Sequence, residues 1–200
     1  MIIPNEEVRQ TFRDEIDKWE DELLHNSRSA TSLLDSALSG NIEEFKKQFI
    51  NAIESIVSSY DIAGRDEQTY HMLCLGFFIA GSRRGYQIRS NKEAGHGRYD
   101  IALYPVHSTV GKRAVILEFK VISSDLRTYD RAVIEAKLHK LAGTGLNQIE
   151  NQRYQLDVPI WCTELIEYGV SFYKKHCVML ARQYHRPINS DNWEVISSDL

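Results

Sequence analysis

The sequence predicts an α/β fold, with a mixed central sheet flanked by helices and an N-terminal helical segment before it. One observation is the order of patterns along the chain, which runs helix, three strands, helix, strands. Another is a pair of segments at 97–103 and 113–122, both rich in Val, Ile, Leu, Tyr and Phe, with a turn-like stretch at 105–112 between them. The segment at 113–122 is almost uniformly apolar, which is typical of a strand covered on both faces.

Composition limits the classes of function. A chain of 200 residues suits one domain, or one domain with a helical appendage. A formal net charge of −4 gives no general basic field, so nucleic-acid binding would need a local patch. Cys74, Cys162 and Cys177 lie in apolar segments without metal-ligand spacing, and we expect them to be core residues. No apolar run is long enough to span a bilayer and no signal-like segment opens the chain. We therefore expect a cytoplasmic protein without a membrane partner.

Residues 1–60 are predicted to be helical. Apolar residues recur near the helical period over 6–24. Asn41 and Glu44 then resemble a capping box that opens a helix reaching about residue 58. Because such periodicity is the signature of a packed helix, we expect this segment to be either a small subdomain or a cover for the elements after it.

The next elements lead into the two apolar strands. Asp66 is predicted to cap a helix that ends near residue 79, with Glu67 and His71 four residues apart on one side of it. A strand is predicted at 86–90, and a polar turn at 91–97.

The C-terminal half is predicted to hold a long helical region and a final pair of strands. Gly143 and Gly145 are expected to divide the helical region in two. The predicted elements are helices at 125–141 and 146–154 and strands at 168–172 and 176–180.

The two central strands carry charge where a core should be apolar. Asp100 interrupts one strand, while Glu118 and Lys120, two residues apart, share a face of the other. A buried charge is costly unless it is paired or binds a metal. Carboxylate oxygens are suitable ligands for Mg²⁺. A water activated by the metal, with a lysine beside it, is an arrangement that can hydrolyse a phosphodiester. The alternative is a partly exposed edge with an ion pair between Asp100 and Lys120.

Two histidines leave alternatives open. His71 is either a catalytic base or a helix residue satisfied by a hydrogen bond near Glu67, and the second is commoner for a lone histidine. His96 lies in a glycine-flanked turn beside Asp100, where it would contact phosphate or be solvated.

A series of segments carries a further pattern, in this order along the chain: 3–9, 67–71, 90–93, 95–101, 117–121, 148–154 and 168–175. In these segments the sequence resembles the PD-(D/E)XK nucleases. Within them it resembles the nuclease domain that comes after an AAA-ATPase-like module in many bacterial chains. The resemblance implies a restriction-endonuclease-like core.

The resemblance also implies roles for particular residues. Asp100 and Glu118 would be the ligands of Mg²⁺ or Mn²⁺, Lys120 the catalytic lysine, and Glu67 an outer acidic residue from the preceding helix.

Further residues are implied near the substrate. Gln148 and Tyr154 look like the family's pair on the helix after the Glu-x-Lys strand, although Gly145 stands where alanine is more usual. With them, His96 and Arg98 are the candidate substrate-binding residues.

The resemblance also implies a domain plan. Residues 1–60 would be the remnant of a linker to an ATPase-like module, residues 61–182 the nuclease-like domain, and residues 183–200 a C-terminal tail. The chain has no G-x-x-x-x-G-K-[ST] phosphate loop, so by this resemblance it corresponds to the C-terminal part of that architecture, either standing alone or cut from something larger. An ATPase-like module or protein is then an expected partner. The expected function is metal-dependent cleavage of DNA, with RNA also open. The alternative is a non-catalytic module of the same fold that binds nucleic acid or protein.

Overall fold

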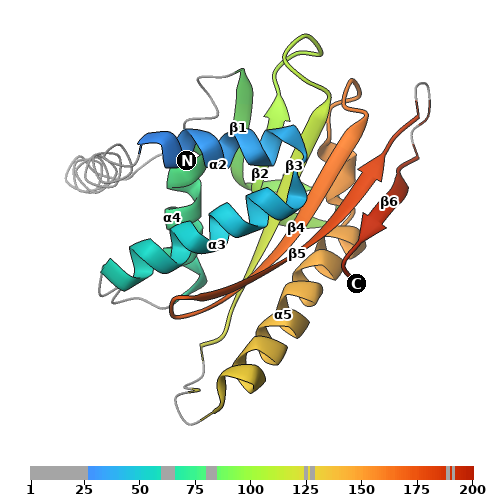
Figure 1. The fold of residues 1–200 in the computed structure, drawn as a ribbon. Coiled ribbons are helices and arrows are strands. Elements are labelled where there is room, and N and C mark those ends of the chain that lie inside the picture. Colours follow the sequence, from blue (N-terminus) through green and yellow to red (C-terminus); the bar gives the residue numbers. More distant parts are fainter. Residues whose placement is uncertain are drawn as a thin grey trace, which may run out of the picture.

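The computed structural model describes residues 27–59, 66–79, 85–123, 126, 129–187, 190 and 192–200. Within them, a six-stranded sheet lies between helices on its two faces (Figure 1). The predicted α/β class, a mixed sheet flanked by helices with helices before it, is confirmed. The helix predicted at 6–24 lies outside the described residues.

The strands lie in the sheet in the same order as in the sequence. They are β1 (Tyr86–Ala94), β2 (Gly97–Pro105), β3 (Arg113–Val121), β4 (Glu164–Tyr173), β5 (His176–His185) and β6 (Glu194–Ser198). Neighbours are antiparallel except β3 and β4, which are parallel. A parallel pair needs a long crossover, and helix α5 (Arg131–Asn151) supplies it on one face of the sheet.

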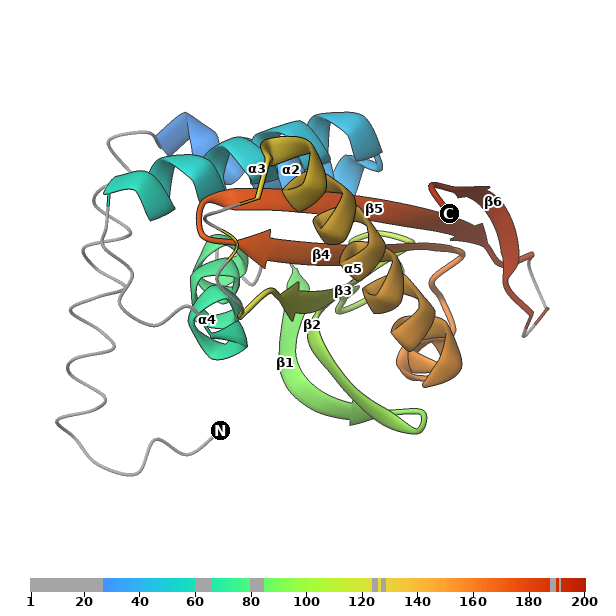
Figure 2. The ribbon, with the colours of Figure 1, turned by 90° about the horizontal axis from the view of Figure 1, so that it is seen from below.

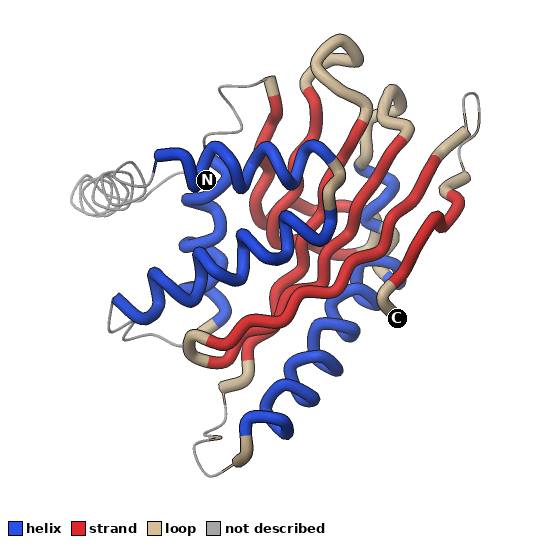
Figure 3. The backbone as a smooth tube through the Cα atoms, viewed as in Figure 1, coloured by secondary structure: helices blue, strands red, loops and turns tan. Residues whose placement is uncertain are grey.

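The opposite face is covered by α2 (Ser27–Ser39), α3 (Ile42–Ser59) and α4 (Glu67–Phe78). In Figures 1 and 3, α2 and α3 cross in front of the sheet while α5 runs behind it. Phe45 of α3 is fully buried, with its ring centroid 4.9 Å from that of Tyr168 in β4. The amide of Glu44 donates to Asn41 Oδ1 at 3.2 Å, as the capping pattern predicts. Helices α2 and α3 thus share one core with the sheet, which favours the cover over a separate subdomain.

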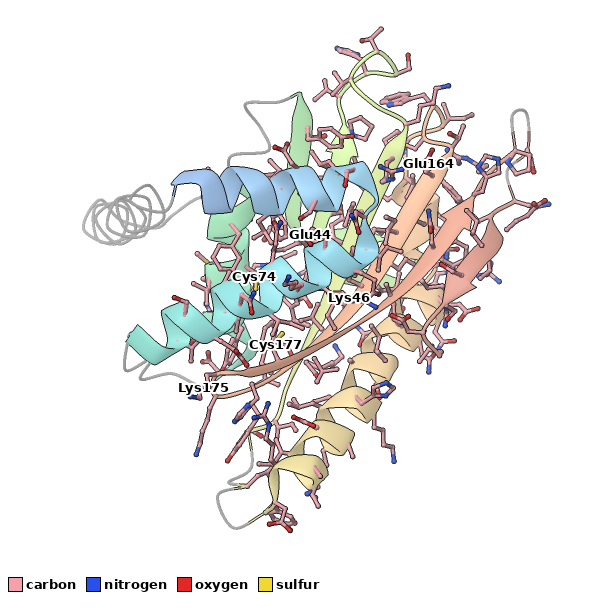
Figure 4. All side chains as sticks on the ribbon, in the orientation of Figure 1. Glu44, Lys46, Cys74, Glu164, Lys175 and Cys177 are labelled. Carbon is pink, nitrogen blue, oxygen red and sulfur yellow. The ribbon has the colours of Figure 1, made fainter. Side chains whose placement is uncertain are left out.

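The buried cysteines agree with the sequence analysis. All three are free and buried. Figure 4 shows Cys74 and Cys177 in the layer between the helices and the sheet. No helix among the described residues has the length and apolarity needed to cross a membrane.

Several element boundaries differ from the predictions. The polar turn predicted at 91–97 is wrong, because β1 and β2 continue as a paired hairpin and only Gly95 and His96 separate them. Polar side chains are tolerated there because much of this part of β1 is exposed. The expected tail also contains β6, whose residues are all exposed and which is held by main-chain pairing with β5. No apolar pattern marks such a strand.

Helix α5 is continuous where a break at the glycines was predicted, and it begins at Arg131 rather than near residue 125. The glycines face the sheet. A Cβ on Gly145 would lie 3.3 Å from the carbonyl oxygen of Glu118, and a Cβ on Gly169 of β4 would lie 2.1 Å from the carbonyl oxygen of Ala142. Small residues on both elements therefore permit the close approach of α5 to β3 and β4.

Candidate active site

Asp100 lies where β2 and β3 stop pairing. Their register runs from Leu103 opposite Val115 to Ile101 opposite Leu117, and beyond it the β1–β2 hairpin curves away from the sheet (Figure 2). The backbone N–H of Phe119 donates to Asp100 Oδ2 at 2.6 Å. Since strand N–H groups need an acceptor, the Asp100 carboxylate takes the place of a main-chain carbonyl. The side chain is thereby fixed against β3.

Glu118 and Lys120 share a face of β3, as their spacing predicts. Lys120 Nζ donates to Glu118 Oε1 at 2.8 Å and to the Phe119 carbonyl oxygen at 2.9 Å. Glu118 is 2% exposed, and the Lys120 side chain is 17% exposed. The ion pair therefore joins Lys120 to Glu118, not to Asp100 as the structural alternative supposed.

Gln148 and Tyr154 connect this pair to the hairpin. Gln148 Nε2, on α5, donates to Glu118 Oε1 and lies 3.3 Å from the hydroxyl oxygen of Tyr154. Tyr154 opens the 3₁₀ helix η2 (Tyr154–Asp157), and its hydroxyl donates to the carbonyl oxygen of Arg98. Hydrogen bonds thus link β3, α5, η2 and β2 around the candidate carboxylates.

The two oxygens of Glu118 differ in their surroundings. Lys120 and Gln148 both donate to Oε1, whereas Oε2 is buried and has no hydrogen-bond partner. Burial, and then the nearby charge of Asp100, raises the pKa of Glu118 to about 8, although Lys120 acts in the opposite direction. Burial also raises the pKa of Asp100, opposed by the N–H bond from Phe119. A positive group at Oε2 would relieve both the missing contact and the repulsion.

The donor set fits a hard divalent cation. Among the described residues there is no group of three or more His, Cys, Asp and Glu arranged to hold a metal. Asp100 and Glu118 offer carboxylate oxygens, and Mg²⁺ is commonly held by one or two carboxylates while it keeps waters and substrate oxygens. The partnerless Oε2 of Glu118 is the position at which such a cation fits.

A family model of the PD-(D/E)XK nuclease superfamily matches residues 65–182. This range includes Asp100, Glu118 and Lys120 in the order that the name describes. The chain belongs to the PD-(D/E)XK nuclease superfamily. The family match confirms the prediction made from the sequence. Members of this superfamily are generally nucleases. Comparison with curated proteins found no match.

Glu67, the predicted outer acid, and His71 of this PD-(D/E)XK chain lie on α4, which Asp66 caps by accepting the Thr69 N–H at 2.9 Å. Glu67 is exposed, and its charge contributes to the raised pKa values of Asp100 and Glu118. It thus lies near the carboxylates without hydrogen bonding to them.

His71 is buried, with Nε2 3.1 Å from the carbonyl oxygen of Asp100 and 3.0 Å from Ser90 Oγ. These contacts give Nε2 of His71 two polar partners. They support the satisfied-helix interpretation and give His71 a position behind the Asp100 backbone.

His96 and Arg98 lie apart from the carboxylates, near the end of the PD-(D/E)XK chain's hairpin. Both side chains are exposed. The His96 backbone N–H donates to the carbonyl oxygen of Gln152 at 2.8 Å, and Arg98 pairs with Glu93 at 3.1 Å. Only the main chain of Arg98 joins the network, through Tyr154.

Sequence reasoning missed the residues that anchor the hairpin. Asp157 Oδ2 accepts hydrogen bonds from Arg89 Nη1 at 2.8 Å and from the Tyr99 hydroxyl at 3.0 Å. Lys92 Nζ lies 3.5 Å from the other oxygen. No local signal joins Arg89 to Asp157, which are 68 positions apart. These contacts hold the base of the β2 segment that carries Asp100.

Proposed function

We propose that the protein is a nuclease that hydrolyses phosphodiester bonds of DNA, with RNA as the second substrate class, in the presence of Mg²⁺ or Mn²⁺. Asp100 and Glu118 would hold the cation. The observation that carries this proposal is the asymmetry of Glu118, whose Oε1 receives two donors while its buried Oε2 has none.

A cation bound there would supply Lewis acidity and lower the pKa of a bound water. The chain's own residues prepare the carboxylates. Lys120 and Gln148 hold Glu118 by Oε1 and leave Oε2 available, and the Phe119 N–H fixes Asp100 by Oδ2. Each carboxylate is thus held through one of its two oxygens.

Lys120 is the proposed catalytic lysine. Its ammonium already donates to Glu118 at 2.8 Å and retains partial exposure. An ammonium has three donors, so it can also donate to the attacking water or to a phosphate oxygen on which charge develops. Glu67 is proposed as an outer acid, and Gln148, Tyr154, His96 and Arg98 are proposed as substrate-binding residues.

The cellular context is part of the proposal. Free, buried cysteines suit a reducing cytoplasm. We propose that residues 1–60 adjoin an ATPase-like module or protein, and that 61–182 acts as the nuclease domain. Co-purification of an ATPase-like protein with the full chain would test that partnership.

A cleavage assay tests the activity. We expect wild-type protein to cut plasmid, single-stranded DNA or RNA in Mg²⁺ or Mn²⁺ and to be inert in EDTA. Glu118→Gln and Lys120→Met should each lower the rate by roughly 100-fold or more, since each removes a charged group from the reaction centre. Glu135→Gln, on an exposed part of α5, is the matched control and should cut normally.

The non-catalytic module remains the second candidate. Wild-type protein that binds nucleic acid tightly but cuts no substrate in either metal would favour it. Asp100 and Glu118 would then contribute to nucleic-acid binding without catalysing cleavage.

A further inference from the structure

A pocket opens beside Asp100, between α4 and β1. Its volume is about 920 Å³, within the roughly 300–1,000 Å³ of ordinary small-molecule pockets. Its described lining comes mainly from α4 and β1, with Asp100 contributed by β2. The pocket therefore meets the candidate active site at Asp100, and its volume is large enough for part of a nucleotide.

The lining has the character of a site for a neutral, flat group. Met72, Leu75 and Ile88 supply aliphatic surface, and Gln68 and Asn91 supply side-chain amides. Among the described lining residues there is no lysine or arginine, while the acidic groups include Asp100. Among these described residues, a phosphate would meet the carboxylates of Glu67 and Asp100 and no lysine or arginine. An uncharged ring could pack on the aliphatic wall, with its polar edge toward the amides.

The hairpin geometry places one of these amides close to the reaction centre. The pairs Ser90–Ile101 and Lys92–Tyr99 put Asn91 directly across from Asp100. Asn91 has φ of 49°, a conformation that asparagine tolerates better than most residues. Amide side chains offer both donors and acceptors, as the edges of nucleobases do.

We propose that this pocket binds one unpaired nucleobase of the substrate strand, next to the phosphate that is cut. The inference rests on the proposed nuclease function and adds the substrate class. A paired base is stacked inside the duplex and cannot enter such a pocket. The nuclease therefore acts on single-stranded nucleic acid, or on a nucleotide that it extrudes from a duplex.

Binding measurements test the pocket apart from cleavage. The probes are a labelled single-stranded oligonucleotide and an abasic strand of the same length, both in Ca²⁺ with anisotropy as the readout. We expect loss of the bases to weaken binding by roughly tenfold or more. The double variant Met72→Ala/Asn91→Gly should weaken binding of the base-bearing strand similarly and leave the abasic strand unaffected.

Two further variants keep the test decisive. Gln68→Ala, at an exposed position of α4, should give a smaller loss in the same direction without risk to the core. Leu156→Ala removes a side chain that is 71% exposed and outside the pocket, and should bind both strands as wild type does. Equal binding of the two strands by wild type, or unchanged binding by both pocket variants, would overturn the proposal.

A cleavage assay then shows whether the base comes from a single strand or is extruded from a duplex. A single strand should be cut about tenfold faster than its matched duplex, unless the fluorescence of 2-aminopurine in the duplex rises on binding, which reports extrusion. Equal cleavage of both forms without that rise counts against the pocket. Base-dependent binding without any cleavage would instead reject the nuclease function and retain the pocket.

Discussion

The carboxylate of Asp100 accepts the backbone N–H of Phe119 at the point where β2 and β3 separate. One side chain thus completes the strand pairing and is also a candidate metal ligand. These two roles can be separated by substitution, because an amide keeps an acceptor oxygen and loses the charge.

Asp100→Asn and Asp100→Ala should therefore differ. The Asn variant can still accept from Phe119, so we expect near-wild-type stability in EDTA with loss of Mn²⁺ binding. The Ala variant leaves that N–H without its acceptor and should lose a further ~1–3 kcal/mol. Urea denaturation and Mn²⁺ calorimetry measure the two effects. Equal stability of the two variants would mean that the Phe119 contact contributes nothing.

The raised pKa of Glu118 predicts that the free energy of unfolding falls as the pH rises. The folded pKa is about 8 against an ordinary value of 4.5, so the folded state holds this proton more tightly than the unfolded chain. Stability from this group is present below the ordinary value and is lost as the pH rises through about 8. Glu118→Gln removes this pH dependence, so its stability advantage over wild type in EDTA should grow by ~1–3 kcal/mol between about pH 6 and about pH 9.

Denaturation of both proteins at about pH 6 and about pH 9 checks this difference. Comparing wild type with variant cancels other titrating groups, such as Glu167, whose pKa burial raises to about 7. Saturating Mn²⁺ should restore wild type alone, because the Gln variant lacks the ligand. An advantage that is the same at both pH values would contradict the assignment.

The anchor of the hairpin should matter more than its surface ion pair. Asp157→Ala removes the acceptor of Arg89 and Tyr99, so we expect faster hydrogen exchange across 89–99 and slower cleavage. Glu93→Ala breaks an exposed pair with Arg98 and should change stability by less than about 0.5 kcal/mol. Exchange that responds equally to both variants would show that Asp157 is not the anchor.

The glycines of α5 offer a matched pair. A Cβ on Gly145 would press on the main chain of β3 and β4, whereas a Cβ on Gly143 would meet a flexible side-chain end of Leu200. Alanine favours the helix by ~1 kcal/mol at either position. We expect Gly143→Ala to be stabilising with normal cleavage. Gly145→Ala should shift α5, misplace Gln148 and cut several-fold more slowly, as steady-state kinetics would reveal.

The parts of the site that could be predicted depend on short-range patterns. Glu118 and Lys120 share a face because side chains alternate along a strand, and the structure brings both together with Gln148. The cap at Asp66 is equally local. The contacts of Asp157 could not be predicted, since they join segments with no pattern relating them.

The same distinction holds for the fold. The apolar run of β3 and the helical period of α3 identify those elements directly. The continuity of α5 could not be predicted, because glycine weakens an isolated helix and only the close approach to β4 explains its presence here. β6 and the far end of the hairpin are exposed strands held by main-chain pairing, which leaves little trace in side-chain composition.

The curvature of the hairpin has a consequence for the metal. Asp100 lies on the β1–β2 hairpin, which curves away from the sheet, whereas Glu118 lies on β3, which is paired with β4 in the centre of the sheet. A cation bound by both carboxylates would hold the β1–β2 hairpin in place against the central strands of the sheet. The affinity for the cation and the position of the hairpin would then be reciprocally linked. Any contact that holds the hairpin in this position would therefore also raise the affinity for the cation. A nucleic-acid strand lying along the hairpin would in this way recruit the ion needed to cut it.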